Sequence, residues 1–208
     1  MSTSLAVLYV NGLGNGEPGR FDGLLKSHWG KAGATFVFAS VNWYDGANLE
    51  SKIQQVANEL KDLLTRYEKV ILLGSSAGAS LALNVFARNK QDNIYVINAH
   101  GRLKKGNIRW PDYRTLEWAA HLRYGIKPAS KVFYDSVMLC DTKTLPSLTA
   151  KDKKRILVLK PPIDFIVPIK TMNIPGAKNC MTLLPGHKGA GISHLFFCRN
   201  LILDFARA

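Results

Sequence analysis

The stretch that most constrains the fold is residues 69–82, where an apolar run passes into small residues through Gly74-x-Ser76-x-Gly78. The run predicts a buried strand, and the two glycines let this strand and the following helix approach closely. A serine at such a turn has a strained backbone and a hydroxyl that projects above the sheet, as in a nucleophile elbow. The alternative is a tight turn with an idle serine, because short motifs recur by chance.

Strands alternate with helices along most of the chain. Apolar, β-rich runs predict strands at residues 5–10, 35–41, 69–75, 93–98, 156–160 and 178–184. The runs are nearly continuous in apolar residues, which is typical of parallel strands that are buried on both faces. We therefore expect an α/β fold, a three-layer α/β/α sandwich around a mostly parallel sheet of about six strands.

A chain of 208 residues is long enough for one sizeable core, and we expect residues 1–208 to form a single domain. Residues 101–154 interrupt the alternation after the fourth strand and predict a small helical insertion, with helices over 112–124 and 130–141. This insertion could partly roof a ligand crevice at the carboxyl ends of the strands. Aromatic residues there could line the crevice, although their spacing is more typical of core: Trp110, Tyr113, Trp118 and Phe133.

The composition excludes several classes of protein. No apolar run approaches the roughly 18 residues of a membrane-spanning helix, and the first residues lack a secretory signal, so we expect a cytoplasmic protein. Cys140, Cys180 and Cys198 have no metal-ligand spacing, which predicts reduced thiols and no metal site.

The net charge of +13 is high and could attract an anionic partner, although no nucleic-acid motif accompanies it. A solvated surface is the favoured interpretation, because many basic residues are scattered along predicted helices and loops. The densest clusters, residues 102–109 and 151–155, flank one segment and could form a local positive rim.

Two residues follow later strands in the order that serine catalysis needs. A serine hydroxyl becomes a good nucleophile when a histidine takes its proton, and a carboxylate orients that histidine. Asp164 lies just past the fifth predicted strand and His187 just past the sixth. His194 is the alternative base, but it begins the last predicted helix, from 194 or 195 to 207, where a cap or a buried role is as natural.

The glycine-rich segment after the first strand supplies a second requirement. The developing oxyanion needs two backbone N–H groups, for which Leu13 and Ala77 are the candidates. A rival interpretation is the dinucleotide motif G-x-G-x-x-G over residues 14–19. The acidic residue that this motif needs at the end of the second strand is missing, since Asp45 comes only in the following loop. We therefore expect no cofactor.

Taken together, these motifs make the chain resemble the α/β-hydrolase superfamily, and in particular small bacterial lipases and esterases with a minimal lid. The resemblance covers most of the chain and rests on residues 10–14, 74–78, 164–167 and 175–187. In such lipases a similar interval separates the aspartate from the histidine, which favours His187. Two departures, Asn11 and Ser75 at positions where histidine is frequent, leave the preferred acyl group open.

The resulting functional hypothesis is a serine hydrolase that cleaves a carboxylic ester or thioester of a small molecule through an acyl-enzyme. Amide hydrolysis would use the same residues. The alternative, from another class, is a non-catalytic binding protein of this fold with a basic surface for an anionic partner. The sequence leaves open the natural substrate, the acyl chain length, the oligomeric state and the role of residues 101–154.

Overall fold

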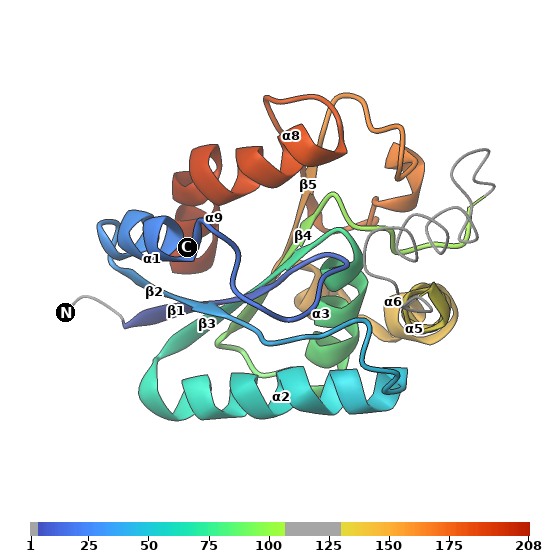
Figure 1. Ribbon diagram of the computed structural model, residues 1–208, viewed down its shortest axis with the longest axis horizontal. Helices are drawn as coiled ribbons and strands as arrows, with labels where there is room; N and C mark the ends of the chain where they lie inside the picture. The colour runs from blue at the N-terminus through green and yellow to red at the C-terminus, as the bar shows by residue number, and fades with distance from the viewer. Residues whose placement is uncertain (1–3, 107–129) are drawn as a thin grey trace.

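A six-stranded sheet forms the centre of the computed structural model, which describes residues 4–106 and 130–208 (Figure 1). Its strands are β1 (Leu5–Val10), β2 (Ala34–Phe38), β3 (Lys69–Ser75), β4 (Ile94–Ala99), β5 (Ile156–Lys160) and β6 (Lys178–Met181). Their order in the sheet is β2-β1-β3-β4-β5-β6, and every neighbouring pair is parallel. The predicted sheet is confirmed.

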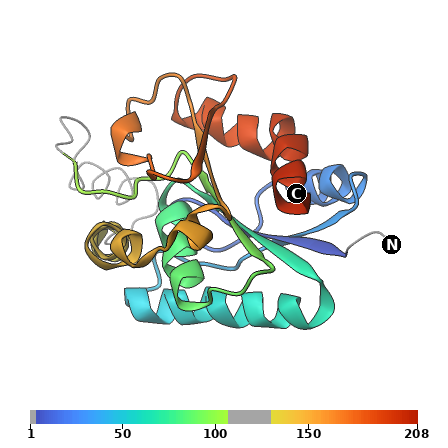
Figure 2. The ribbon, with the colours of Figure 1, turned by 180° about the vertical axis from the view of Figure 1, so that it is seen from behind.

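Helices cover both faces of this sheet. They are α1 (Asp22–Gly30), α2 (Leu49–Arg66), α3 (Ala77–Arg88), α5 (Ser130–Leu139), α6 (Leu145–Ser147), α7 (Ala150–Lys153), α8 (His187–Ile192) and α9 (Arg199–Arg207). Figures 1 and 2 show α2, α3 and α5 on one face and α1, α8 and α9 on the other, which makes three layers. Within the described ranges, no helix has the length and apolar character that crossing a membrane requires. The helix predicted over residues 112–124 lies outside those ranges.

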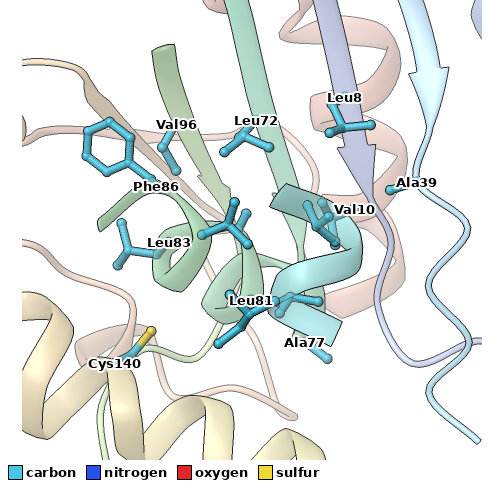
Figure 3. Packing of buried hydrophobic residues seen from close by; sticks show 14 of the residues in the cluster. Leu8, Val10, Ala39, Leu72, Ala77, Leu81, Leu83, Phe86, Val96 and Cys140 are labelled. Atoms are coloured by element: carbon cyan, nitrogen blue, oxygen red, sulfur yellow. The ribbon is translucent and has the colours of Figure 1, made fainter. Parts of the chain in front are cut away.

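Alternate side chains of the inner strands β1, β3, β4 and β5 enter two separate cores, which explains their continuous apolar runs. Leu8, Leu72 and Val96 lie with Phe86 of α3 in the core on one face (Figure 3). Their strand neighbours Val7, Ile71 and Ile97 pack on the opposite face with Trp29 of α1 and Ile202 of α9. Both faces of these inner strands are buried, whereas the edge strand β6 is largely exposed.

The turn between β3 and α3 brings the helix against the backbone of β1. A Cβ atom on Gly78 would lie 2.2 Å from the carbonyl oxygen of Val10 and 2.3 Å from that of Asn11. A Cβ atom on Gly74 would lie 2.5 Å from Cα of Ala79. Neither space admits a side chain, so these two glycines fix how closely the strand, the turn and the helix pack.

The strand order also locates a crevice. The chain runs from β1 to β2 on one side and then continues as β3 on the other side of β1. Such a reversal leaves a crevice beyond the carboxyl ends of the two strands, where ligands bind in open α/β sheets. The loop after β1 and the turn that carries Ser76 lie at this point.

Several predicted boundaries are corrected. The last helix was expected from residue 194 or 195, but α8 already begins at His187 and runs through the π-helix η3 (Ser193–Phe197) towards α9. Gly186, with a φ of 78°, lets the chain turn sharply into α8. The helix expected over 130–141 is α-helical as far as Leu139 and then continues as the π-helix η1 (Cys140–Thr144). Strands β2 and β6 end earlier than predicted.

Replacing Gly78 with alanine should destabilise the fold. The new methyl group would clash with two backbone carbonyls that cannot move independently, and we expect Gly78→Ala to lower the free energy of unfolding by about 1–3 kcal/mol. The matched control is Gly23→Ala in α1, where an added Cβ meets nothing within 4 Å. That variant should gain up to about 1 kcal/mol from helix propensity. Urea unfolding measures both, and equal stability of Gly78→Ala and the native chain would contradict the close approach.

Candidate active site

Ser76 has a strained backbone. Its φ is 52° and its ψ is −121°, in a region that residues other than glycine rarely adopt. The Ser76 N–H donates to the carbonyl of Ala99 at 3.0 Å, and the Ser76 carbonyl accepts from the N–H of Ala79 at 3.1 Å. Such strain costs about 1–3 kcal/mol and persists only where the surroundings enforce it. These hydrogen bonds and the glycine contacts of the turn supply that enforcement.

The structure brings Ser76, His187 and Asp164 together in one chain of hydrogen bonds. The distance from Ser76 Oγ to His187 Nε2 is 2.8 Å, and that from His187 Nδ1 to Asp164 Oδ2 is also 2.8 Å. The other carboxylate oxygen of Asp164 accepts from the N–H groups of Ile166 at 2.8 Å and Val167 at 2.9 Å. The carboxylate side chain is fully buried, whereas 17% of the His187 side chain is exposed.

The surroundings of Asp164 favour its ionised form. Burial raises the pKa of this carboxyl, but the hydrogen bonds from His187, Val167 and Ile166 outweigh burial and lower the pKa below its usual value. An ionised Asp164 accepts a hydrogen bond from Nδ1–H, which keeps that proton on Nδ1 and leaves Nε2 free to accept a hydrogen bond from the serine hydroxyl. This arrangement can remove a proton from Ser76.

His194, the alternative base, lies in η3 and is completely buried. Burial lowers its pKa to about 3, and the backbone of Ala190 opposes this effect only in part. Its ring lies 4.8 Å from the ring of His100. The structure therefore brings His187, and not His194, to Ser76.

His100 is a third histidine at this edge of the sheet, and the sequence analysis assigned it no role. It directly follows β4, has a φ of 46°, and is 2% exposed. Its ring meets the His187 ring edge to face, with 4.5 Å between the ring centres, and its Nε2 lies 3.4 Å from Ser75 Oγ. Burial lowers the pKa of His100 well below its usual value, so the ring is neutral. Its position after a strand was visible in the sequence, but its packing against His187 was not.

The loop after β1 lies directly against Ser76. A Cβ atom on Gly12 would lie 3.1 Å from Ser76 Cβ and 3.6 Å from its Oγ. Leu13 and Ala77, the candidates for the oxyanion site, line the same cavity as Ser76. Residues 14–19 do not open a helix, as the dinucleotide motif would require, because α1 begins only at Asp22.

The cavity over Ser76 has a volume of about 320 Å³, which is at the small end of the range for ligand pockets. Its walls are mainly apolar and include Phe133, Ile166 and Val167. Phe133 thus lies both at the cavity and in the core, whereas Trp110, Tyr113 and Trp118 lie outside the described residues. A second, more apolar cavity of about 610 Å³ lies by α1 and α8 and is lined by neither Ser76 nor His187.

The predicted positive rim is only partly correct. The cluster at 151–155 precedes β5 and so lies at the amino ends of the strands, away from Ser76. It is also partly neutralised, since Lys151 pairs with Asp92 and Arg155 with Asp152. Arg102, from the other cluster, follows β4 and lines the cavity over Ser76. In the described parts of the chain, no group of His, Cys, Asp and Glu side chains is arranged to hold a metal ion.

Comparison with known proteins identifies the fold. No protein-family model and no curated protein matches the sequence. The structure is similar to that of a lipolytic enzyme derived from a metagenome, with a TM-score of 0.70 and 15% identity over 99% of this chain and 94% of that chain. An esterase from Exiguobacterium antarcticum gives a TM-score of 0.64 and 13% identity over 100% of this chain and 94% of that chain. A monoacylglycerol lipase from Paleococcus ferrophilus gives a TM-score of 0.62 and 14% identity over 97% of this chain and 94% of that chain. The chain has the α/β-hydrolase fold, as the sequence predicts.

The buried histidines should make the fold sensitive to acid. Because the pKa of His194 is lowered to about 3, the unfolded chain binds a proton below about pH 6.5 that the folded chain does not. The free energy of unfolding should therefore fall with falling pH, by about 1.4 kcal/mol per pH unit for this residue. Between about pH 6 and about pH 4.5, His194→Leu should remove the contribution of His194 to the slope of the unfolding free energy against pH. The contribution of His100 to this slope should remain. Denaturant unfolding at several pH values measures the slopes, and equal slopes for both chains would contradict a neutral His194.

Proposed function

We propose that the chain is a serine hydrolase that cleaves a carboxylic ester or thioester of a small molecule. The proposal rests on the 2.8 Å hydrogen bond between Ser76 Oγ and His187 Nε2, with His187 held in turn by the buried Asp164. The fold by itself does not establish an activity, because one fold can carry many functions. The side-chain arrangement therefore carries the proposal, and the fold is consistent with it.

In the proposed reaction, Ser76 Oγ attacks the carbonyl carbon while its proton passes to His187 Nε2. The N–H groups of Leu13 and Ala77 stabilise the oxyanion of the tetrahedral intermediate. This intermediate expels the alcohol or thiol, which takes the proton from His187, and an acyl-enzyme remains. Water then attacks the acyl group with His187 as the base, and the acid leaves as Ser76 regains its proton. Asp164 stays ionised throughout and stabilises the imidazolium.

Two observations favour a small ester as the substrate. The structural neighbours include a lipolytic enzyme, an esterase and a monoacylglycerol lipase, which is consistent with ester cleavage. The cavity of about 320 Å³ with its apolar walls favours a short, largely apolar acyl group. Exposed apolar side chains on the loops that carry Asp164 and precede His187, among them Ile163, Phe165 and Leu183, could contact the rest of such a substrate.

The nucleophile can be tested by covalent labelling with a fluorophosphonate probe. The native chain should be labelled, and Ser76→Ala should lose both labelling and hydrolysis of para-nitrophenyl esters, with kcat reduced roughly 10⁴-fold or more. Ser75→Ala is the matched control, because Ser75 is the adjacent residue and its Oγ contacts His100 and not His187; this variant should still be labelled. A native chain that is not labelled would overturn the proposal and favour a non-catalytic binding protein.

The base can be tested with two histidine variants. His187→Ala should lower kcat for the same esters roughly 10⁴-fold, because the serine proton then has no acceptor within hydrogen-bond distance. His194→Leu should lower kcat less than about tenfold, since Ser76 Oγ bonds to His187 while the neutral His194 ring packs against His100. Circular dichroism checks that both variants are folded. Loss of turnover in the His194 variant alone would show that the base is wrongly assigned.

A further inference from the structure

Arg102 is a buried cation at the cavity over Ser76. Its residue exposure is 9%, and it belongs to the loop that follows β4. Its Nε donates to the carbonyl of Lys104 at 3.1 Å, and its Nη2 donates to that of Gly106 at 3.3 Å. A guanidinium has five N–H donors, and within residues 4–106 and 130–208 these two hydrogen bonds leave the other donors without an acceptor.

The other buried cations of the described chain have a carboxylate partner. Lys52 is 1% exposed and pairs with Asp45, and Arg155 is 7% exposed and pairs with Asp152 at 2.9 Å. Arg102 has no carboxylate oxygen within 4.0 Å among residues 4–106 and 130–208. Burying a cation without an opposite charge is costly, and among the described residues this guanidinium lacks the carboxylate partner that the other two have.

Arg102 stays charged although its surroundings lower its pKa. Burial lowers its pKa, while Tyr134 and Asp141 act at longer range and raise it. Arginine stays protonated in proteins despite such shifts. The nearby walls, Phe133, Ile166 and Val167, carry no charge, and a charge pair is stronger in such an apolar setting than in water.

We propose that Arg102 binds an anionic group of the substrate, so that the preferred ester carries a carboxylate near its scissile carbonyl. The inference rests on the proposed hydrolase function and names its substrate class. Arg102 and Ser76 line the same cavity of about 320 Å³, so a short chain can join the two groups. A guanidinium binds a carboxylate through two parallel N–H donors, which would orient the ester as well as attract it. The net charge of +13 would assist the approach of such a substrate.

Matched esters test this proposal. On the acyl side, the mono-para-nitrophenyl ester of glutarate is compared with the same compound capped as a methyl ester. On the leaving-group side, the butyrate ester of meta-hydroxybenzoate is compared with that of its methyl ester. For each pair the ratio of kcat/KM, charged over neutral, measures selectivity. The native chain should prefer the charged ester in one pair, and Arg102→Met should lower that ratio about tenfold to a hundredfold.

Two further variants control this measurement. Lys105→Met removes an exposed cation from the same loop and should leave the ratio within about twofold of the native value, because a solvated charge is screened. Arg102→Lys retains the charge without the planar fork and should keep part of the selectivity, which also serves if Arg102→Met does not fold.

The outcomes separate this proposal from the proposed function. A native chain that hydrolyses the neutral esters through Ser76 but shows no preference for either charged ester overturns the role of Arg102 and leaves the hydrolase standing. Equal losses of selectivity in Arg102→Met and Lys105→Met also overturn it, because they indicate general attraction by the basic surface. No Ser76-dependent turnover of any of the four esters overturns both proposals.

Discussion

The contact between α3 and the end of β1 is the interaction on which the site depends. Gly78 packs directly on the carbonyls of Val10 and Asn11, and Gly101 packs on α3 from the other side, where an added Cβ would lie 2.1 Å from Ala79 Cβ. Backbone therefore meets backbone on both sides of the turn, which leaves Ser76 no room to relax from its positive φ. The same contact places the loop after β1 beside the serine hydroxyl.

The remaining groups come from loops at the same edge of the sheet, because the strands are parallel and all end there. Asp164 follows β5 and His187 follows β6. The buried, neutral ring of His100 packs against the rings of both His187 and His194. Neutral rings do not compete with Asp164 for the charge of an imidazolium. Asp164 is therefore the ionised hydrogen-bond partner of His187, and the neighbouring histidine rings are buried and neutral.

The parallel sheet and the edge that holds the site could be predicted from the sequence, since buried parallel strands have a clear apolar signal and their ends mark one edge of the sheet. The structure brings together Ser76, Asp164 and His187, whose catalytic roles stay predictions. The start of α8 was missed because Gly189 and Gly191 disfavour a helix, and tertiary packing of residues such as the buried Ala190 overrides that propensity. The π-helix η3 has no periodic signal. The lack of a carboxylate beside Arg102 in the described part of the chain and the packing of His100 on His187 depend on contacts between distant segments, which spacing does not encode.

The distance along the chain between Ser76 and His187 has a consequence for biosynthesis. The two residues are 111 positions apart, and His187 follows β6, the last strand to join the sheet in chain order. A nascent chain that has been made up to Gly101 holds the glycine contacts of the serine turn but has no His187 beside Ser76. Since chains emerge from the amino terminus, the proposed nucleophile would remain unreactive until β6 and His187 have been made. A copy that ends before His187 would thus not react with a serine probe. Reactivity towards such a probe would show that the sheet has been completed up to β6.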